Sequence, residues 1–405
     1  MTKNKIPQNI YNLLILLPYL WLVTGLFLYK DSDKGMVIMM AVAVIASIAT
    51  QGLKVAKENI ANSKMLWLIF AITLYAIFSY FYHGLSSREI RAFIALSVFL
   101  PFFPKDLLTK RLLIILTIIG SFVSFMSAFY YSSIIDLNRA HWPINAIPFA
   151  TIVATLSLLS LNLRLIANSK PQKNLLLISF LFSIIALVLS QTRGVWIAFS
   201  ISILVNIVLI VRSSKIKYDY KKILATLTLL LITIMLCYPK IEQRFQETQY
   251  DINRVSKGQM TGSIGLRLQM LAVTPDMVKG DLLLGTGNKQ LEKLNRLYSE
   301  GKVPLYLYRY GPPHYHNQYA DKLIKNGVIG LTLFILLLTL PLIEAKYITA
   351  NNKRITTCII LLFSISALTD APFNHGQSIF IFVLIIYALN NKPPSCTNEK
   401  VISEK

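Results

Sequence analysis

The sequence predicts an all-α integral membrane protein with about twelve transmembrane helices, and three observations support this fold class. Of the 405 residues, 54% are hydrophobic and only 15% are charged, and the mean hydropathy is +0.55. Soluble domains are usually less than half apolar. Apolar runs of about 17 to 22 residues recur along the chain, and each could cross a hydrocarbon core of about 30 Å. Most basic residues lie in the gaps between these runs.

The apolar runs divide the chain into four regions. Residues 1–238 carry nine predicted spans, and residues 239–324 form a large polar segment with helix-like pieces at 264–273, ended by Pro275, and at 290–298. Residues 325–390 carry the last three spans, and residues 391–405 form a tail. The predicted spans are 11–29, 35–52, 65–82, 90–104, 111–132, 145–164, 174–190, 194–212, 222–238, 325–345, 354–370 and 376–390.

Lysine and arginine are distributed unevenly between alternate connections, and this bias predicts the orientation of the chain. The connections at 53–64, 105–111, 164–173 and 212–222 are rich in base and are expected to be cytoplasmic, together with both termini. The intervening connections are poor in base, which places the polar segment outside the cytoplasm. All five histidines fall on that external side: His83, His141, His314, His316 and His375.

The composition also excludes some classes of function. The formal net charge of +22 is spread over the connections instead of forming one patch, so it reflects membrane topology and does not predict nucleic-acid binding. The three cysteines, Cys237, Cys358 and Cys396, are far apart in the sequence. They form neither a disulfide framework nor a zinc motif.

Two histidines close the polar segment in the stretch from Pro312 to Tyr319, and three interpretations of them are open. His314 and His316 could be metal ligands, although the sequence offers no His-Glu-x-x-His motif or cysteine pair to complete a site. They could simply be structural residues in a proline-rich turn. A neutral imidazole could also act as a general base toward an attacking hydroxyl. His316 is the first candidate for this base and His314 the second.

Two arginines are candidates for binding an anion. Arg193 stands between two apolar spans with almost no loop around it. It either anchors the chain at the membrane interface beside Trp196 or binds a phosphate with two parallel guanidinium hydrogen bonds. Arg267 lies on a helix-like piece of the polar segment, where an arginine taken alone is more often a surface or packing residue than an anion ligand.

Two short patterns carry weaker signals. Gly285-Thr286-Gly287 could lend backbone donors to a phosphate, but a lone Gly-x-Gly is more often a turn. Asp31 and Asp33 resemble an Asp-x-Asp metal motif, but their position between Lys30 and Lys34 favours a solvated loop.

Together these residues resemble the O-antigen ligase family (lipid A-core surface polymer ligase), which is related to O-antigen polymerases and bacterial O-oligosaccharyltransferases. The most specific match is His316-Asn317, a nine-residue spacer, and then Gly327-Val328-Ile329-Gly330. By the same resemblance, Arg193 in Thr192-Arg193-Gly194 and Arg267 match the family's two arginines. The resemblance implies a GT-C-like glycosyltransferase architecture, with the polar segment as a periplasmic loop that carries catalytic residues.

The resemblance also implies a function. The donor would be an O-antigen glycan on undecaprenyl pyrophosphate, and the acceptor a sugar hydroxyl of lipid A-core in lipopolysaccharide biosynthesis. Arg193 and Arg267 would hold the pyrophosphate, His316 would take the acceptor proton, and Asn317 would contribute to substrate binding. We expect inverting transfer without a metal or another cofactor, at the periplasmic face of a Gram-negative inner membrane.

Three alternatives remain open at this point. The enzyme could be a polymerase that joins O-units, or it could glycosylate proteins. A transporter for the same lipids would bind pyrophosphate with the same arginines but would need no base. It predicts ionisable groups deep within the spans, whereas those in this sequence crowd the span ends.

Overall fold

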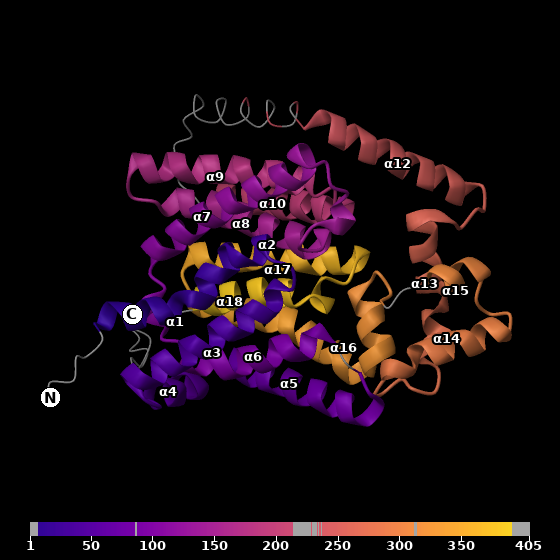
Figure 1. Cartoon of the computed structure of the whole chain (residues 1–405), viewed down its shortest axis with the longest axis horizontal. Helices are drawn as coiled ribbons and strands as arrows, with labels where there is room; N and C mark the ends of the chain where they lie inside the picture. The colour runs from indigo at the N-terminus through magenta and orange to yellow at the C-terminus, as the bar shows by residue number, and fades with distance from the viewer. Residues whose placement is uncertain are drawn as a thin grey trace, which may run out of the picture.

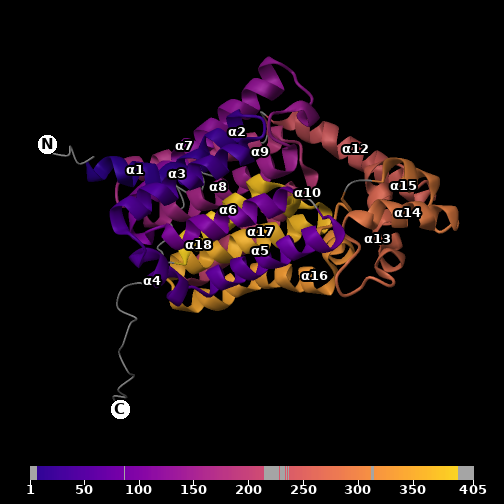
Figure 2. The same ribbon diagram turned by 60° about the horizontal axis from the view of Figure 1, so that its bottom comes forward.

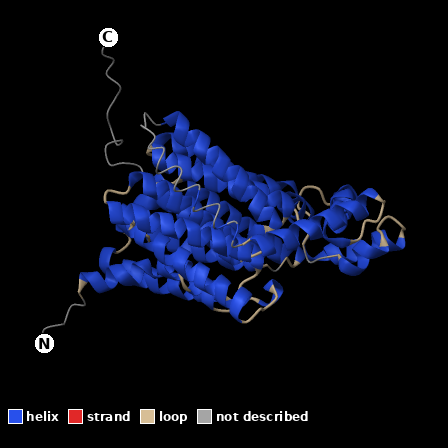
Figure 3. Cartoon of the chain, turned by 90° about the horizontal axis from the view of Figure 1, so that it is seen from above, coloured by secondary structure: helices blue, strands red, loops and turns tan. Residues whose placement is uncertain are grey.

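The computed structural model describes residues 7–85, 87–213, 228, 233, 235, 237–311 and 314–390, and the regular secondary structure within them is entirely helical (Figure 3). The longer helices are α1 Gln8–Val23, α3 Ser32–Gln51, α4 Lys54–Asn62, α5 Lys64–His83, α6 Arg88–Phe102, α7 Lys110–Phe129, α8 Ala146–Ile166, α9 Lys170–Leu189, α10 Arg193–Ser213, α12 Tyr238–Ser256, α13 Gly262–Val278, α14 Gln290–Ser299, α16 Gln318–Glu344, α17 Ala350–Thr369 and α18 Gly376–Leu389. The short elements are α2 Gly25–Leu28, η1 Lys105–Leu107, η2 Tyr130–Ile134, η3 Arg139–His141, η4 Gly287–Lys289, α15 Leu305–Tyr310, η5 Ala345–Tyr347 and η6 Pro372–Asn374.

Among the described residues, seven helical stretches are long and apolar enough to cross a membrane. They are Ser32–Gln51, Lys64–His83, Lys110–Ile134, Ala146–Ile166, Lys170–Leu189, Arg193–Arg212 and Gln318–Tyr347. The predicted spans at 11–29, 90–104, 354–370 and 376–390 coincide with α1, α6, α17 and α18, which are shorter or more polar. Most of the predicted span at 222–238 lies outside the described residues. The helical membrane-protein class is therefore supported, and the count of twelve stays a prediction.

The centre of the bundle is formed by α17 and by α18, which is apolar on every side. Helices α17 and α18 lie between α7 to α10 on one side and α3 to α6 on the other (Figure 1). Almost every side chain of α18 is buried, and a cluster of aromatic rings from Phe363, Phe373 and Phe382 joins α17 to α18. A helix without a polar face must be covered by lipid or by other helices, and α18 is covered by other helices.

The polar segment forms a small helical unit at one end of the bundle. Helices α12 to α15 project beyond the other helices in both views (Figures 1 and 2). A second, separate core joins α13, α14 and α15 to the start of α16, and it is built from Met270, Val273, Met277, Leu294, Leu297, Val303, Leu307, Tyr315, Ala320 and Ile324. The predicted helix at 290–298 is confirmed as α14. The predicted end of the other helix at Pro275 is wrong, because α13 continues through this proline to Val278.

Helix α16 begins within the polar segment and is broken at Gly327. It starts at Gln318, seven residues before the predicted span at 325, and Gly327 has φ 63° and ψ −167°. The backbone groups released by the break bond to the polar segment, since Val328 N–H donates to Leu282 O at 2.9 Å and Thr286 N–H donates to Ile324 O at 2.7 Å. The Gly285-Thr286-Gly287 stretch is therefore a turn docked on α16, with the Thr286 amide already in use.

Candidate active site

A cavity of about 530 Å³ opens where the polar segment meets the end of the bundle. Its wall is formed by the connections before α8 and α10, by α12 and α13, and by the residues at the start of α16 and the end of α17. The polar and charged residues of this wall are Arg139, Asn145, Thr192, Arg193, Arg244, Thr248, Ser263, Arg267, His316, Thr369 and Asp370. The structure therefore brings His316, Arg193 and Arg267 together, although they are far apart in the sequence.

His316 is held by an aspartate that the sequence reasoning missed. Its Nδ1 lies 3.1 Å from Asp370 Oδ1. The backbone of His316 has φ 41°, in the left-handed region that favours glycine. Such strain costs about 1–3 kcal/mol and tends to persist at functional sites. An Nδ1–H that donates to the carboxylate leaves Nε2 with its lone pair, which is the tautomer a general base requires.

Asp370 is fixed in place from several directions. The Ala371 N–H donates to its Oδ1 at 2.9 Å, and the Gln318 N–H donates to its backbone oxygen at 3.0 Å. Burial by itself raises the pKa of Asp370, but the hydrogen bond and charge of His316 together with the charge of Arg267 leave the pKa below its ordinary value. The carboxylate is therefore ionised at neutral pH.

His314 belongs to the same cluster. Its Nε2 lies 4.0 Å from Asp370 Oδ1, and its ring centroid lies 4.5 Å from that of His316. Burial, followed by the neighbouring His316, lowers the pKa of His314, so its imidazole is neutral at neutral pH. Ligand atoms of His314, His316 and Asp370 all lie within 4.8 Å of one another, so these three residues could hold a metal ion. No metal-binding motif in the sequence indicated Asp370 as a ligand.

The two predicted arginines approach the cavity from different elements. Arg193 is the first residue of α10 and donates to Thr248 Oγ1 at 2.7 Å, and its guanidinium lies 3.6 Å from Asp251. Arg267 on α13 donates through Nε to Thr369 O at 3.1 Å and lies 3.7 Å from the Asp370 carboxylate. These contacts point both guanidiniums toward the cavity and connect the polar segment to α10 and α17.

Two further arginines line the cavity and were not among the predicted site residues. Arg139 donates to Gln191 O at 2.8 Å, and Arg244 on α12 pairs with Glu247. Burial, and then the nearby Arg139, lowers the pKa of Arg244 to about 10, so it is still charged at neutral pH. Burial and the charge of Arg193 also lower the pKa of Arg139. Crowded cations that depress one another's pKa form a site suited to a multiply charged anion.

Asn317 has a structural role that the sequence did not indicate. Its side-chain oxygen accepts from Tyr319 N–H and Ala320 N–H, each at 3.0 Å, and so caps α16. Its amide donates to Leu368 O at 3.2 Å. Asn317 is absent from the cavity wall, so a contact with substrate stays a prediction.

The Asp-x-Asp pattern near the N-terminus does not form a common site. Asp31 pairs with Lys34 at 3.0 Å, whereas Asp33 is buried and pairs with Arg91 at 2.6 Å. The expectation of a solvated loop is therefore wrong for Asp33. Because the two carboxylates are neutralised by different cations, they are poor candidates for holding one metal ion.

Comparison with known proteins supports the resemblance to the O-antigen ligase family. Residues 178–335 match the model of a family described as O-antigen ligase, which confirms the predicted resemblance to that family. An uncharacterised protein of Haemophilus influenzae is 26% identical over 243 residues, covering 57% of this chain and 59% of that protein. The chain thus matches about three fifths of the length of this curated relative. Arg193, Arg244, Arg267 and His316 fall within the family match, whereas Arg139 and Asp370 lie outside it.

Proposed function

We propose that this protein, which carries an O-antigen ligase domain, transfers a glycan from undecaprenyl pyrophosphate to a sugar hydroxyl of lipid A-core. The family supports a transfer reaction of the ligase or polymerase type. The observation that carries the proposal is the His316–Asp370 pair at the wall of a cavity lined by four arginines. A base beside a strongly cationic cavity suits a reaction in which a hydroxyl attacks and a pyrophosphate leaves.

The anionic donor would bind in the arginine-lined cavity. Arg193 and Arg267 would clamp the pyrophosphate, and Arg139 and Arg244 would add positive charge around it. Preorganised cations stabilise negative charge that grows on a leaving group in a site with little water. Their planar donors also suit bidentate binding to phosphate oxygens.

The acceptor would be activated by His316. Its Nε2 takes the proton of the acceptor hydroxyl while the hydroxyl oxygen forms a bond to the anomeric carbon of the donor. The bond from this carbon to the pyrophosphate oxygen breaks, and undecaprenyl pyrophosphate leaves with the electron pair. Asp370 stabilises the imidazolium that forms, and direct displacement inverts the anomeric centre.

The location of the cavity suits two amphiphilic substrates. The cavity lies between the apolar bundle and helices α12 and α13 of the polar segment, so a lipid tail can stay in the bilayer while its headgroup reaches the site. In this proposal the protein spans the inner membrane of a Gram-negative bacterium with both termini in the cytoplasm. The segment 239–324 is then a periplasmic loop, and the site faces the periplasm.

The acceptor is identified by giving purified protein an undecaprenyl-pyrophosphate-linked glycan together with one acceptor at a time. The three acceptors are lipid A-core, a second lipid-linked O-unit and a pilin-like protein. We expect product only with lipid A-core. Product with the second O-unit alone would assign a polymerase, and glycosylated pilin would assign a protein O-oligosaccharyltransferase.

A further inference from the structure

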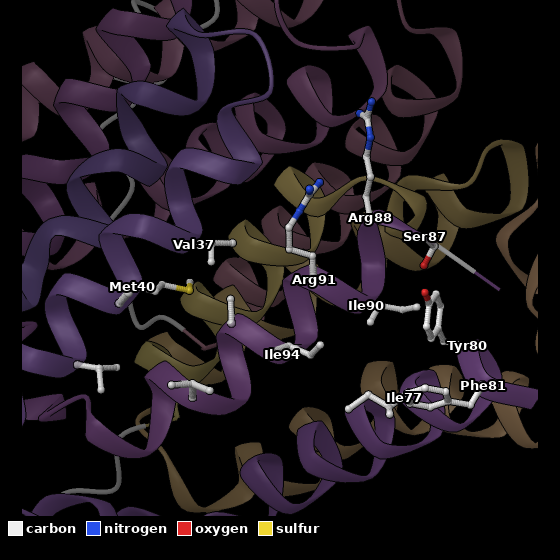
Figure 4. Close-up of a pocket in the computed structure, with 14 residues that line it drawn as sticks. Val37, Met40, Ile77, Tyr80, Phe81, Ser87, Arg88, Ile90, Arg91 and Ile94 are labelled. Carbon is white, nitrogen blue, oxygen red and sulfur yellow. The ribbon is translucent and has the colours of Figure 1, made fainter. Parts of the chain in front are cut away.

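A second, apolar groove lies on the side of the bundle formed by α3, α5 and α6, and its volume is about 880 Å³. Figure 4 shows α6 between residues of α3 and residues of α5, with aliphatic side chains along the length of the groove. Several of these side chains are substantially exposed, including Val98 at 51% and Phe81 at 80%. The residues that define its apolar walls are Val37, Met40, Ile77, Phe81, Ile94 and Val98.

Two arginines stand at one end of the groove, where α6 begins. Arg91 pairs with the buried Asp33 on α3 at 2.6 Å, so its charge is already partly matched. Arg88 is exposed, and within the described part of the chain it forms no ion pair. The side chains of Arg88 and Arg91 extend away from the aliphatic residues (Figure 4). The groove is therefore amphipathic, with long apolar walls and a cationic end.

The cationic end is connected to the candidate active site through the short link between α17 and α18. This link begins at Asp370, the partner of His316, and ends at Gly376, where a Cβ atom would lie 3.2 Å from Asp33 Cβ. Between them stands His375. Burial, followed by the charges of His314 and Arg88, lowers the pKa of His375 to about 4, although the charges of Asp370 and Asp33 act in the opposite direction. The charges of Arg88 and His314 therefore both act on His375.

We propose that this groove binds the acyl chains of the acceptor, a phosphate-bearing glycolipid, with one of its phosphates at Arg88. This inference rests on the proposed function and identifies a site for its second substrate. Because Arg88 forms no ion pair among the residues that the structure describes, its charge favours a lipid with an anionic headgroup over a neutral one. The arginine-lined cavity, at the Asp370 end of the link between α17 and α18, already suits the donor pyrophosphate. The cationic end of the groove lies near the Gly376 end of the same link. Two amphiphiles can thus approach one base from two sides.

The test uses full-length protein in nanodiscs. Val98→Trp fills the groove, and Arg88→Gln removes its free charge. Each should raise the KM for the lipid acceptor about tenfold, as expected for the loss of one charged hydrogen bond or of comparable apolar contact, while the KM for the donor stays unchanged. Arg88→Lys should restore most of the affinity. Leu74→Trp is the matched control, because Leu74 is 68% exposed on α5 and does not line the groove.

A binding measurement keeps this inference separate from the proposed reaction. A phosphorylated glycolipid with photoreactive acyl chains should label peptides of α3 and α6, and Val98→Trp should reduce the labelling. Excess phosphatidylglycerol should not compete. Equal competition by phosphatidylglycerol would assign the groove to bulk phospholipid and overturn the inference, as would an unchanged acceptor KM in both groove variants. If wild-type protein transfers no glycan but the labelling holds, the proposed reaction fails and the lipid site stands.

Discussion

The imidazole Nδ1 of His316 lies 3.1 Å from the carboxylate of Asp370, a residue 54 positions later in the chain. This contact joins the residues just before α16 to the residue just after α17. It places the imidazole of His316, a residue with positive φ, at the wall of the arginine-lined cavity. In the proposed mechanism His316 is the base and Asp370 is a positioning residue that acts through it.

His316→Ala should abolish transfer, and Asp370→Asn should lower kcat on the order of hundredfold, because an amide does not hold the same tautomer of His316 or stabilise its imidazolium. The measurement is kcat and KM with saturating donor. His141→Ala is the control, since His141 is exposed and outside the cavity wall. Retained transfer by folded His316→Ala protein would remove the base from the mechanism.

Arg193→Lys should reduce transfer on the order of hundredfold although the charge is kept, because a lysine cannot make the bidentate contact of a guanidinium. Arg212→Lys, at the other end of α10, is the matched control and should have no effect. Donor titrations with each variant measure the change. Near-normal activity of Arg193→Lys would favour the interfacial-anchor interpretation.

We expect transfer to continue in EDTA, because arginines can stabilise the pyrophosphate leaving group without a divalent ion. The EDTA test also distinguishes a base role of His316 from metal binding, because His314, His316 and Asp370 could together hold a metal ion. The initial rate is measured with purified protein before and after chelation. Loss of activity that a divalent ion restores would replace the base role of His316 with metal binding by this cluster.

The protein should lose stability as the pH falls from about 6.5 to about 4. Burial depresses the pKa of His375 from its ordinary value of 6.5 to about 4, and the unfolded state therefore binds more protons between these values. The contribution of neutral His375 to the free energy of unfolding is complete above pH 6.5. It is lost as the pH falls toward 4, and the loss reaches about 3 kcal/mol. Thermal unfolding of wild type and His375→Gln in detergent measures it. Identical pH profiles for the two proteins would contradict this assignment.

Gly327→Ala should destabilise the junction between α16 and the polar segment. Gly327 has φ +63°, and a Cβ there would lie 2.2 Å from Leu283 O. Gly301→Ala is a matched control, because Gly301 has φ +72° but no atom within 4 Å of an added Cβ. The difference in unfolding free energy should be about 2 kcal/mol or more, beyond the backbone strain that both variants share. Equal unfolding midpoints would show that the contact with Leu283 yields easily.

The sequence by itself determined the helical membrane class, the positions of most long helices and three residues of the cavity wall. Apolar runs and their basic flanks are local signals, because a helix that crosses a bilayer must satisfy its own backbone hydrogen bonds and be apolar along its length. Local motifs likewise marked His316, Arg193 and Arg267. A local rule was wrong at Pro275, where α13 continues for its last turn.

Only the tertiary structure decided which residues lie together. Asp370, Arg139 and Arg244 reach the cavity from separate connections and helices, and no spacing in the sequence indicates that Asp370 meets His316. The break at Gly327 is likewise stabilised by Leu282 and Thr286 of the polar segment. Such contacts depend on how whole helices pack, whereas sequence patterns report the environment of one helix at a time. The contact between His316 and Asp370 and the apolar groove on α3, α5 and α6 both belong to this second kind of information.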